Sequence, residues 1–129
     1  MIASRYEGTF VDGRRHGQGT LNFACGSIYE GQFAENHING MGNFSFANAL
    51  AQYQGIFEKG KFNGLGQLNF ARGNIIYLGE FVKGFFSGRG KLVNLMHNFF
   101  YEGLWFKGKM HGDGVLFHFD VVTPANLSS

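Results

Sequence analysis

The chain has 129 residues, of which 44% are hydrophobic and 17% aromatic, and its formal net charge is +2. This length corresponds to one domain, the mild charge gives no support to nucleic-acid binding, and no stretch is long and apolar enough for a membrane span. A single cysteine, Cys25, excludes an internal disulfide framework and suits a reducing compartment. The chain enters its repeat pattern within a few residues of Met1, which predicts no signal peptide, so we expect a cytoplasmic protein.

A tyrosine followed by glycines at fixed offsets recurs along almost the whole chain. The five copies begin at Tyr6, Tyr29, Tyr53, Tyr77 and Tyr101. Counted from each tyrosine, the positions plus 2, 7, 11 and 13 hold glycine in nineteen of twenty cases. The exception is Asn36, a residue type that tolerates left-handed backbone angles. A period of 23 to 24 residues indicates a repeat architecture.

Within the first copy, the pattern predicts a β-hairpin. Residues 6–10 alternate with period two, which predicts a strand with Tyr6, Gly8 and Phe10 on one face. Asp12-Gly13 is typical of a hairpin turn, and residues 17–23 alternate again as the returning strand. The connector 24–28 then leads into the second copy. Frequent glycine disfavours helix throughout.

Repetition of this hairpin predicts an all-β protein, an elongated single-layer antiparallel β-meander that grows by two strands per copy. We expect one array over residues 1–120 and a C-terminal tail over 121–129. On one face, aromatic rings alternate with bare glycine backbone, so that rings can lie flat over neighbouring strands. The opposite face is polar in the first copy, as at Glu7 and Thr9, but becomes less polar in the last two. A position that holds phenylalanine in earlier copies holds Asn94 and His118 there.

The spacing resembles the MORN (membrane occupation and recognition nexus) repeat. The pattern Tyr-Glu-Gly-x-Phe-x-x-Gly-x-x-His/Asn-Gly-x-Gly extends from Tyr6 to about Phe119. The resemblance implies a twisted meander with an aromatic-lined groove and a non-catalytic role, because the repeat occurs in junctional membrane proteins, radial-spoke components, small myosin-binding proteins and lipid-kinase regulatory regions. It favours a scaffolding protein in the cytoplasm, with the cytoskeleton or a cilium as candidate sites.

The first candidate site is the aromatic row on the glycine-bearing face. A single sheet has no second layer to cover such rings, and exposed aromatic surface is typical of a partner site. The row consists of Tyr6, Phe10, Tyr29, Phe33, Tyr53, Phe57, Tyr77, Phe81, Tyr101 and Trp105. We expect it to bind a helix or an extended peptide of a protein partner, and alanine at Tyr53 and Phe57 to weaken binding without unfolding the array. The alternative is that the rings only pack on one another.

The second candidate site is a basic fringe, because a meander brings successive hairpin tips to one edge. Its lysines are Lys59, Lys61, Lys83, Lys107 and Lys109. Such a fringe suits the surface of an anionic phospholipid membrane, and ordinary solubility of turns is the alternative interpretation.

No catalytic, cofactor or metal site is predicted. His16 and His111 share the plus 10 position with Asn39, Asn63 and Ser87, where a polar side chain is expected to bond the turn backbone. One cysteine does not complete a zinc site. Segments 55–61 and 103–109 resemble a phosphate-binding loop but lack its serine or threonine and the following helix. Nothing resembles a Gly-x-Ser-x-Gly elbow, so enzyme function ranks third.

Both ends of the array are predicted to be open sheet edges. In the last copies Leu104, Val115 and Phe117 place apolar side chains on the face that is polar in the first copy. Terminal repeats need polar caps or a partner. We therefore expect repeats four and five to be covered by another chain, either a second copy in a homo-oligomer or a subunit of a larger complex.

Overall fold

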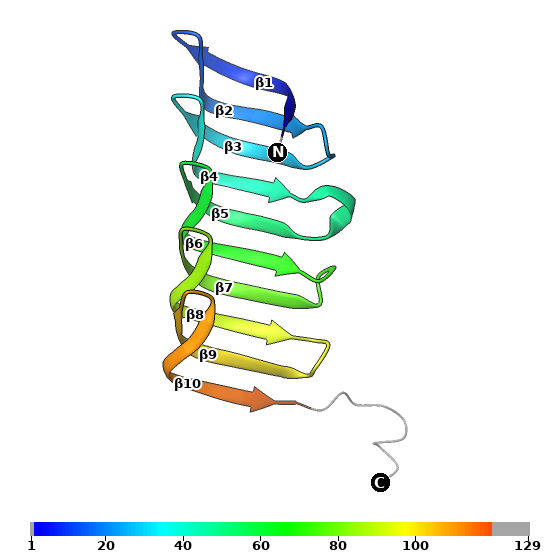
Figure 1. Cartoon of the computed structure of the whole chain (residues 1–129), viewed down its shortest axis with the longest axis vertical. Helices are drawn as coiled ribbons and strands as arrows, with labels where there is room; N and C mark the ends of the chain where they lie inside the picture. Colours follow the sequence, from blue (N-terminus) through cyan, green and yellow to red (C-terminus); the bar gives the residue numbers. More distant parts are fainter. Residues whose placement is uncertain (1, 120–129) are drawn as a thin grey trace.

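A computed structural model describes residues 2–119, which form one ten-stranded antiparallel sheet with the strands in chain order (Figure 1). This confirms the predicted all-β meander. The strands are β1 (Ala3–Val11), β2 (Arg14–Phe23), β3 (Ile28–Ala34), β4 (His37–Ser45), β5 (Gln52–Glu58), β6 (Lys61–Phe70), β7 (Ile75–Val82), β8 (Phe85–Asn94), β9 (Phe99–Phe106) and β10 (Lys109–His118). A short 3-10 turn, η1 (Ala47–Ala49), lies between β4 and β5. The tail predicted over 121–129 lies outside the described residues.

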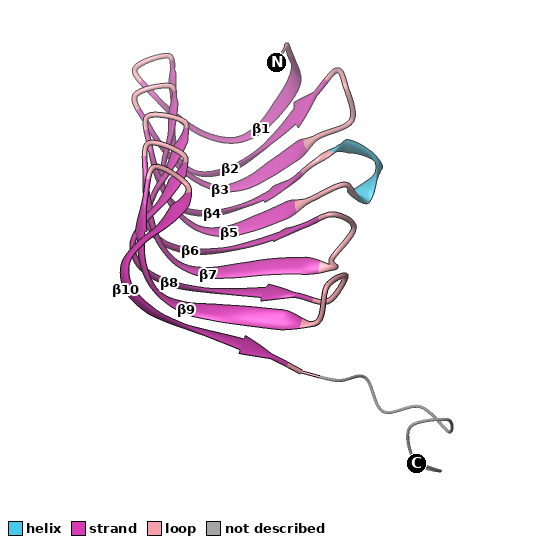
Figure 2. Cartoon of the chain, turned by 60° about the horizontal axis from the view of Figure 1, so that its bottom comes forward, coloured by secondary structure: helices cyan, strands magenta, loops and turns pink. Residues whose placement is uncertain are grey.

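The hairpin turns adopt the geometry that their sequences predict. Asp12 and Gly13 both have positive φ, 51° and 77°, as a two-residue type I′ turn requires. Asn36 replaces glycine in the second turn with φ 71°, so the predicted left-handed asparagine is confirmed. These turns rise together along one side of the sheet, because the strands bend before they reach them (Figure 2).

The bend coincides with a break in the register of each hairpin, as between Gly55 and Phe57, and with the place where each tyrosine lies over glycine. The Tyr53 hydroxyl donates a hydrogen bond of 2.7 Å to the carbonyl of Ile56, three residues further along the same strand. A Cβ atom added at Gly66 on the neighbouring strand would lie 2.6 Å from ring carbons of Tyr53. The predicted flat packing of rings on bare backbone is therefore confirmed. The same tyrosine hydrogen bond occurs from Tyr6, Tyr29, Tyr77 and Tyr101.

The core of this single layer is made of rings that cover one another. In repeats two to five, the plus 4 aromatic packs edge-on against the tyrosine of the preceding repeat, as Phe57 does against Tyr29 with ring centroids 5.1 Å apart. Edge-to-face contacts of this kind are the favoured arrangement of aromatic pairs. Inter-repeat contacts thus replace the missing second layer.

The opposite face changes character along the array. It carries exposed Glu7 and Thr9 on β1, but exposed Leu78 on β7 and Val115 and Phe117 on β10. Within residues 2–119, β1 pairs only with β2 and β10 only with β9, so both edges of the described sheet are open. Over the same range, no helix combines the length and apolar composition that crossing a membrane requires.

Candidate functional site

The predicted aromatic row is brought onto one face, but most of it is not accessible. Its two members on β1 keep exposed surface, Phe10 being 59% exposed. The other eight are buried: Tyr29, Phe33, Tyr53, Phe57, Tyr77, Phe81, Tyr101 and Trp105. The expectation that a single layer leaves these rings uncovered is therefore wrong, because neighbouring repeats close over them. These eight side chains form the floor of the concave face, and a role in partner binding stays a prediction.

Burial also changes the mutational test that the sequence suggests. Tyr53 is 0% exposed, and its ring stacks on Phe62 with centroids 3.8 Å apart. Phe57 packs against both Tyr29 and Tyr53. Truncating a buried aromatic side chain to alanine costs about 3–5 kcal/mol. Alanine at these two positions would disturb the sheet itself, so the expectation that the array stays folded is not supported.

The accessible part of the concave face is supplied mainly by the returning strands. A pocket of about 300 Å³ opens there over the first three repeats. Its lining consists of Phe23, Ile38, Phe44, Phe46, Phe57, Gly60 and Phe62. Every side chain in this lining is apolar, and Phe23, Phe46 and Phe62 remain half-buried at its surface. We call this site the phenylalanine pocket.

Of the residues that line the phenylalanine pocket, sequence reasoning named Phe57 as a site residue and missed the others, although their signal was present. Phe23, Phe46 and Phe70 all occupy the plus 17 position, on the same face as the tyrosines. In the fourth repeat, Asn94 replaces phenylalanine at the plus 17 position. Its Oδ1 accepts hydrogen bonds from the backbone N–H groups of Met96 and His97, both 3.0 Å long. Asn94 thus holds the β8–β9 connector and adds nothing apolar to the surface.

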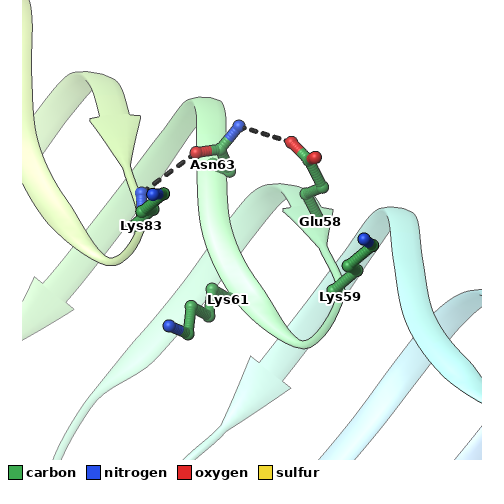
Figure 3. Close-up of a pocket in the computed structure, with 5 residues that line it drawn as sticks. All are labelled: Glu58, Lys59, Lys61, Asn63 and Lys83. Carbon is green, nitrogen blue, oxygen red and sulfur yellow. Dashed lines mark hydrogen bonds between the residues drawn. The ribbon is translucent and has the colours of Figure 1, made fainter.

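The second candidate site lies at the hairpin tips. Lys59, Lys61 and Lys83 come from two successive hairpins and surround a pocket of about 420 Å³ together with Glu58 and Asn63 (Figure 3). Asn63 joins the two tips, because its amide nitrogen donates to Glu58 at 2.9 Å and its oxygen accepts from the Lys83 backbone N–H at 3.0 Å. We call this site the lysine pocket.

The remaining predicted lysines do not line the lysine pocket. Lys107 and Lys109 belong to the last hairpin, where the Lys107 ammonium lies 5.3 Å from the ring of Phe106. Phe106 is exposed, as are Val82 and Phe85 on the preceding tip. The tips of the last repeats thus combine positive charge with apolar side chains, whereas the first hairpin pairs Arg14 with Glu35 of the second, 3.7 Å apart.

The polar plus 10 residues bond turn backbone, as predicted, but in the next repeat. Asn39 accepts a hydrogen bond from the Lys59 N–H at 3.1 Å, and His16 Nδ1 accepts one from the Glu35 N–H at 3.4 Å. These side chains therefore tie successive hairpins together. Among residues 2–119, no three His, Cys, Asp or Glu side chains come together in a way that could hold a metal ion.

Burial extends to higher pH the range over which the central tyrosines stay neutral. Desolvation raises the pKa of Tyr29, Tyr53 and Tyr77 from 10 to about 12. At physiological pH these phenols are thus structural hydrogen-bond donors.

Comparison with known protein families identifies the repeat. A family model described as the MORN repeat matches residues 6–27, 29–49, 53–75, 77–93 and 101–117. A comparison with curated proteins finds no match. MORN repeat proteins often have binding or scaffolding roles and are generally non-catalytic. Since the matched segments begin at the five tyrosines of the repeat and cover most of the chain, this chain belongs to the MORN repeat family.

Proposed function

We propose that this chain is a non-catalytic scaffolding module whose concave face binds an apolar helix or extended peptide of a protein partner. The observation that carries the proposal is the phenylalanine pocket, a depression of about 300 Å³ whose lining side chains are all apolar, on a single-layer sheet. Accessible aromatic surface bordered by polar residues is typical of interaction sites.

The spacing of the repeat defines what ligand fits. Equivalent side chains of successive repeats are two strands apart, or roughly 10 Å. That distance matches residues i and i+7 of a helix, about 10.5 Å along the axis, or residues i and i+3 of a peptide in the extended polyproline II conformation, about 9 Å. We therefore expect ligands to carry large apolar residues at one of these two spacings.

The proposal is tested with peptides selected against the immobilised full chain from a random displayed library. Affinities of the selected peptides are then measured by calorimetry for the unmodified chain and for a Phe23→Ser, Phe46→Ser variant. Both side chains lie at the surface of the pocket, so the variant should fold. Loss of two apolar anchors at about 1–2 kcal/mol each predicts a loss of affinity of roughly thirtyfold or more.

A matched control comes from the opposite face of the same region. Met41 and Leu65 are exposed apolar residues there, so Met41→Ser, Leu65→Ser removes comparable surface outside the phenylalanine pocket. Peptide affinity should stay within about twofold in this control. Equal affinity of the folded pocket variant and the unmodified chain would contradict the proposal.

A second candidate function is binding of an anionic phospholipid surface, favoured by the lysine pocket and by the exposed apolar side chains on neighbouring tips. Each lysine at an anionic bilayer contributes about 1 kcal/mol. Glutamine at Lys59, Lys61, Lys107 and Lys109 should therefore abolish flotation with vesicles that contain phosphoinositide, and binding of the unmodified chain should weaken as salt increases.

The control for this experiment is Lys91→Gln, which removes one positive charge over the ring of Phe100, away from the tips. The vesicle affinity of this variant should fall by at most the contribution of one lysine, about 1 kcal/mol. Salt-independent flotation, or flotation unaffected by the four substitutions, would rule out the charged tips as the binding surface.

A further inference from the structure

One interface is built four times inside this chain, wherever the second strand of a repeat meets the first strand of the next. At the β8–β9 interface Gly88 lies opposite Trp105, Gly90 opposite Gly103, and Leu92 opposite Tyr101. The equivalent residues pair in the same way between β2 and β3, β4 and β5, and β6 and β7. The register between repeats is therefore constant along the array.

The backbone contact between successive hairpin turns is also the same at every junction. The plus 7 N–H donates to the plus 9 carbonyl of the preceding repeat at all four junctions, for example from Gly60 to Ile38 at 2.9 Å. At three of them the plus 6 N–H also donates to the plus 10 side chain of the preceding repeat, as from Glu35 to His16. Each junction thus has a sheet part and a turn part.

The two ends of the described sheet expose the two halves of this interface. Phe10, the plus 4 aromatic of the first repeat, is 59% exposed, whereas its equivalent Phe57 is 2% exposed. Leu116, the plus 15 residue of the last repeat, is 54% exposed, whereas its equivalent Leu92 is 9% exposed. The internal residues are buried because a neighbouring repeat covers them. At the ends of residues 2–119 that cover is missing from both halves.

We propose that copies of this chain associate head to tail, with β10 of one copy pairing antiparallel to β1 of the next in the register that joins successive repeats. Leu116 then lies opposite Tyr6, Gly114 opposite Gly8, and Gly112 opposite Phe10. The row of paired glycines that crosses the sheet continues into the next copy. The occupant of the open edge is a second copy of this chain, because both halves of a specific interface are present on one molecule.

Side chains outside the glycine row fit the same register. His111 occupies the plus 10 position, as His16 does, and is placed to accept a hydrogen bond from the Asp12 N–H of the next copy. On the opposite face Lys91 lies over Phe100, 4.6 Å from its ring centroid, and Phe100 stacks on exposed Phe117 with centroids 5.2 Å apart. Arg5 of the next copy falls opposite Phe117, where a guanidinium group can stack on the ring.

The geometry of this contact predicts a distribution of sizes. Because the two surfaces differ, one association leaves a free head and a free tail, so growth is open-ended. A symmetric pairing of two β10 edges would instead stop at a dimer. The two modes therefore differ in their response to variants that block one end.

The test uses sedimentation velocity on full-length variants with a glutamate at one end, Phe10→Glu or Leu116→Glu. Both side chains are largely exposed, so folding should be preserved, and thermal unfolding checks this. The unmodified chain should form a concentration-dependent series of species. Each variant alone should be monomeric, and an equimolar mixture of the two should form a dimer, because an intact tail then meets an intact head. The controls Phe85→Glu and Leu65→Glu, at exposed sites away from both edges, should behave like the unmodified chain.

Disulfide trapping detects weak association and its register. Thr20 lies opposite Glu30 at the β2–β3 interface, so Val115 should lie opposite Glu7 of the next copy. Opposed side chains have Cβ atoms about 4.5–5.5 Å apart, close enough for a disulfide after slight adjustment. Oxidation of Glu7→Cys, Val115→Cys in a Cys25→Ser background should give a ladder on a non-reducing gel, and Glu7→Cys, Asp113→Cys should react at least tenfold more slowly.

Three results would overturn the proposal. The first is a monomer at every concentration with no ladder. The second is equal trapping of both cysteine pairs, which would show random collision. The third is a dimer formed by Phe10→Glu but not by Leu116→Glu, which would identify symmetric pairing of β10 edges.

Discussion

Alanine at Gly66 tests whether contact between tyrosine rings and glycine backbone holds the array together. The backbone of Gly66 does not have positive φ, so alanine is compatible with its conformation. In a strand, alanine would by itself be favoured over glycine by roughly 0.5–1 kcal/mol. A Cβ atom at this position would, however, lie 2.6 Å from ring carbons of Tyr53 and closer still to its hydroxyl oxygen.

The ring of Tyr53 has no room to retreat from such a Cβ atom. It stacks on Phe62 at 3.8 Å, meets Phe57 at 4.9 Å and Phe81 at 5.2 Å, all measured between ring centroids. Overpacking in a filled core costs about 1–3 kcal/mol, and loss of the hydrogen bond from Tyr53 to Ile56 costs about 1 kcal/mol. After the roughly 0.5–1 kcal/mol gained from alanine in a strand is subtracted, we expect Gly66→Ala to lower the free energy of unfolding by about 1–3.5 kcal/mol.

Urea unfolding followed by far-ultraviolet circular dichroism measures this change, with an unaltered m-value as the sign that the transition is comparable. A double-mutant cycle then identifies the cause. In a Tyr53→Leu background the ring edge is gone, so Gly66→Ala should cost less than about 1 kcal/mol. As control, Gly60→Ala has no atom within 4 Å of its Cβ but requires φ +79°, so its cost should be independent of residue 53. If Gly66→Ala and Tyr53→Leu are additive, the ring contact is not what excludes a side chain.

The three buried tyrosines whose pKa burial raises from 10 to about 12 predict alkaline unfolding. Because the folded state favours the neutral phenols, the stability that they contribute is complete below pH 10 and is lost as the pH rises through 12. The absorbance change at 295 nm from these three tyrosines should occur together with loss of the circular dichroism of the sheet. Ionisation of the three tyrosines near pH 10 with the sheet intact would contradict this prediction. Asn63→Ala removes the acceptor for the Lys83 N–H and should cost about 1 kcal/mol, with faster amide exchange at Lys83 as the local measurement; unchanged exchange would refute the role of this bond. At the equivalent position Ser87 makes no such bond within residues 2–119, so Ser87→Asn should raise the urea midpoint slightly. A lowered midpoint would show that asparagine adds no favourable hydrogen bond between these two turns.

The repeat and its hairpins could be predicted because each depends on residues close together in the sequence. The Asp12-Gly13 turn has positive φ at both residues, and Asn36 replaces glycine where only the left-handed conformation matters. Alternation with period two is enough to place Tyr6, Gly8 and Phe10 on one face, without knowledge of which strands pair. A constant period then implied that every copy would form the same hairpin and pair with its neighbours in order.

Accessibility could not be predicted in the same way, because it depends on contacts between repeats. The aromatic row was assigned to the correct face, but its exposure was not, since Phe57 is covered by Tyr29 of the repeat before it. Most of the phenylalanine pocket was missed for the same reason. Contacts between repeats decide which rings of this face are buried and which line its surface.

The sequence by itself therefore determined the fold class, the turns, the strand order and the face of each side chain, because glycine, tyrosine and the period act locally. The tertiary structure alone decided that Asn39 bonds the turn of the next repeat and that Lys59, Lys61 and Lys83 share one pocket. It also decided that the aromatic row is core, while Phe10 and Leu116 remain uncovered at the two edges. Each of these outcomes depends on how far one repeat bends over the next, and that distance is set by packing between segments about 24 residues apart.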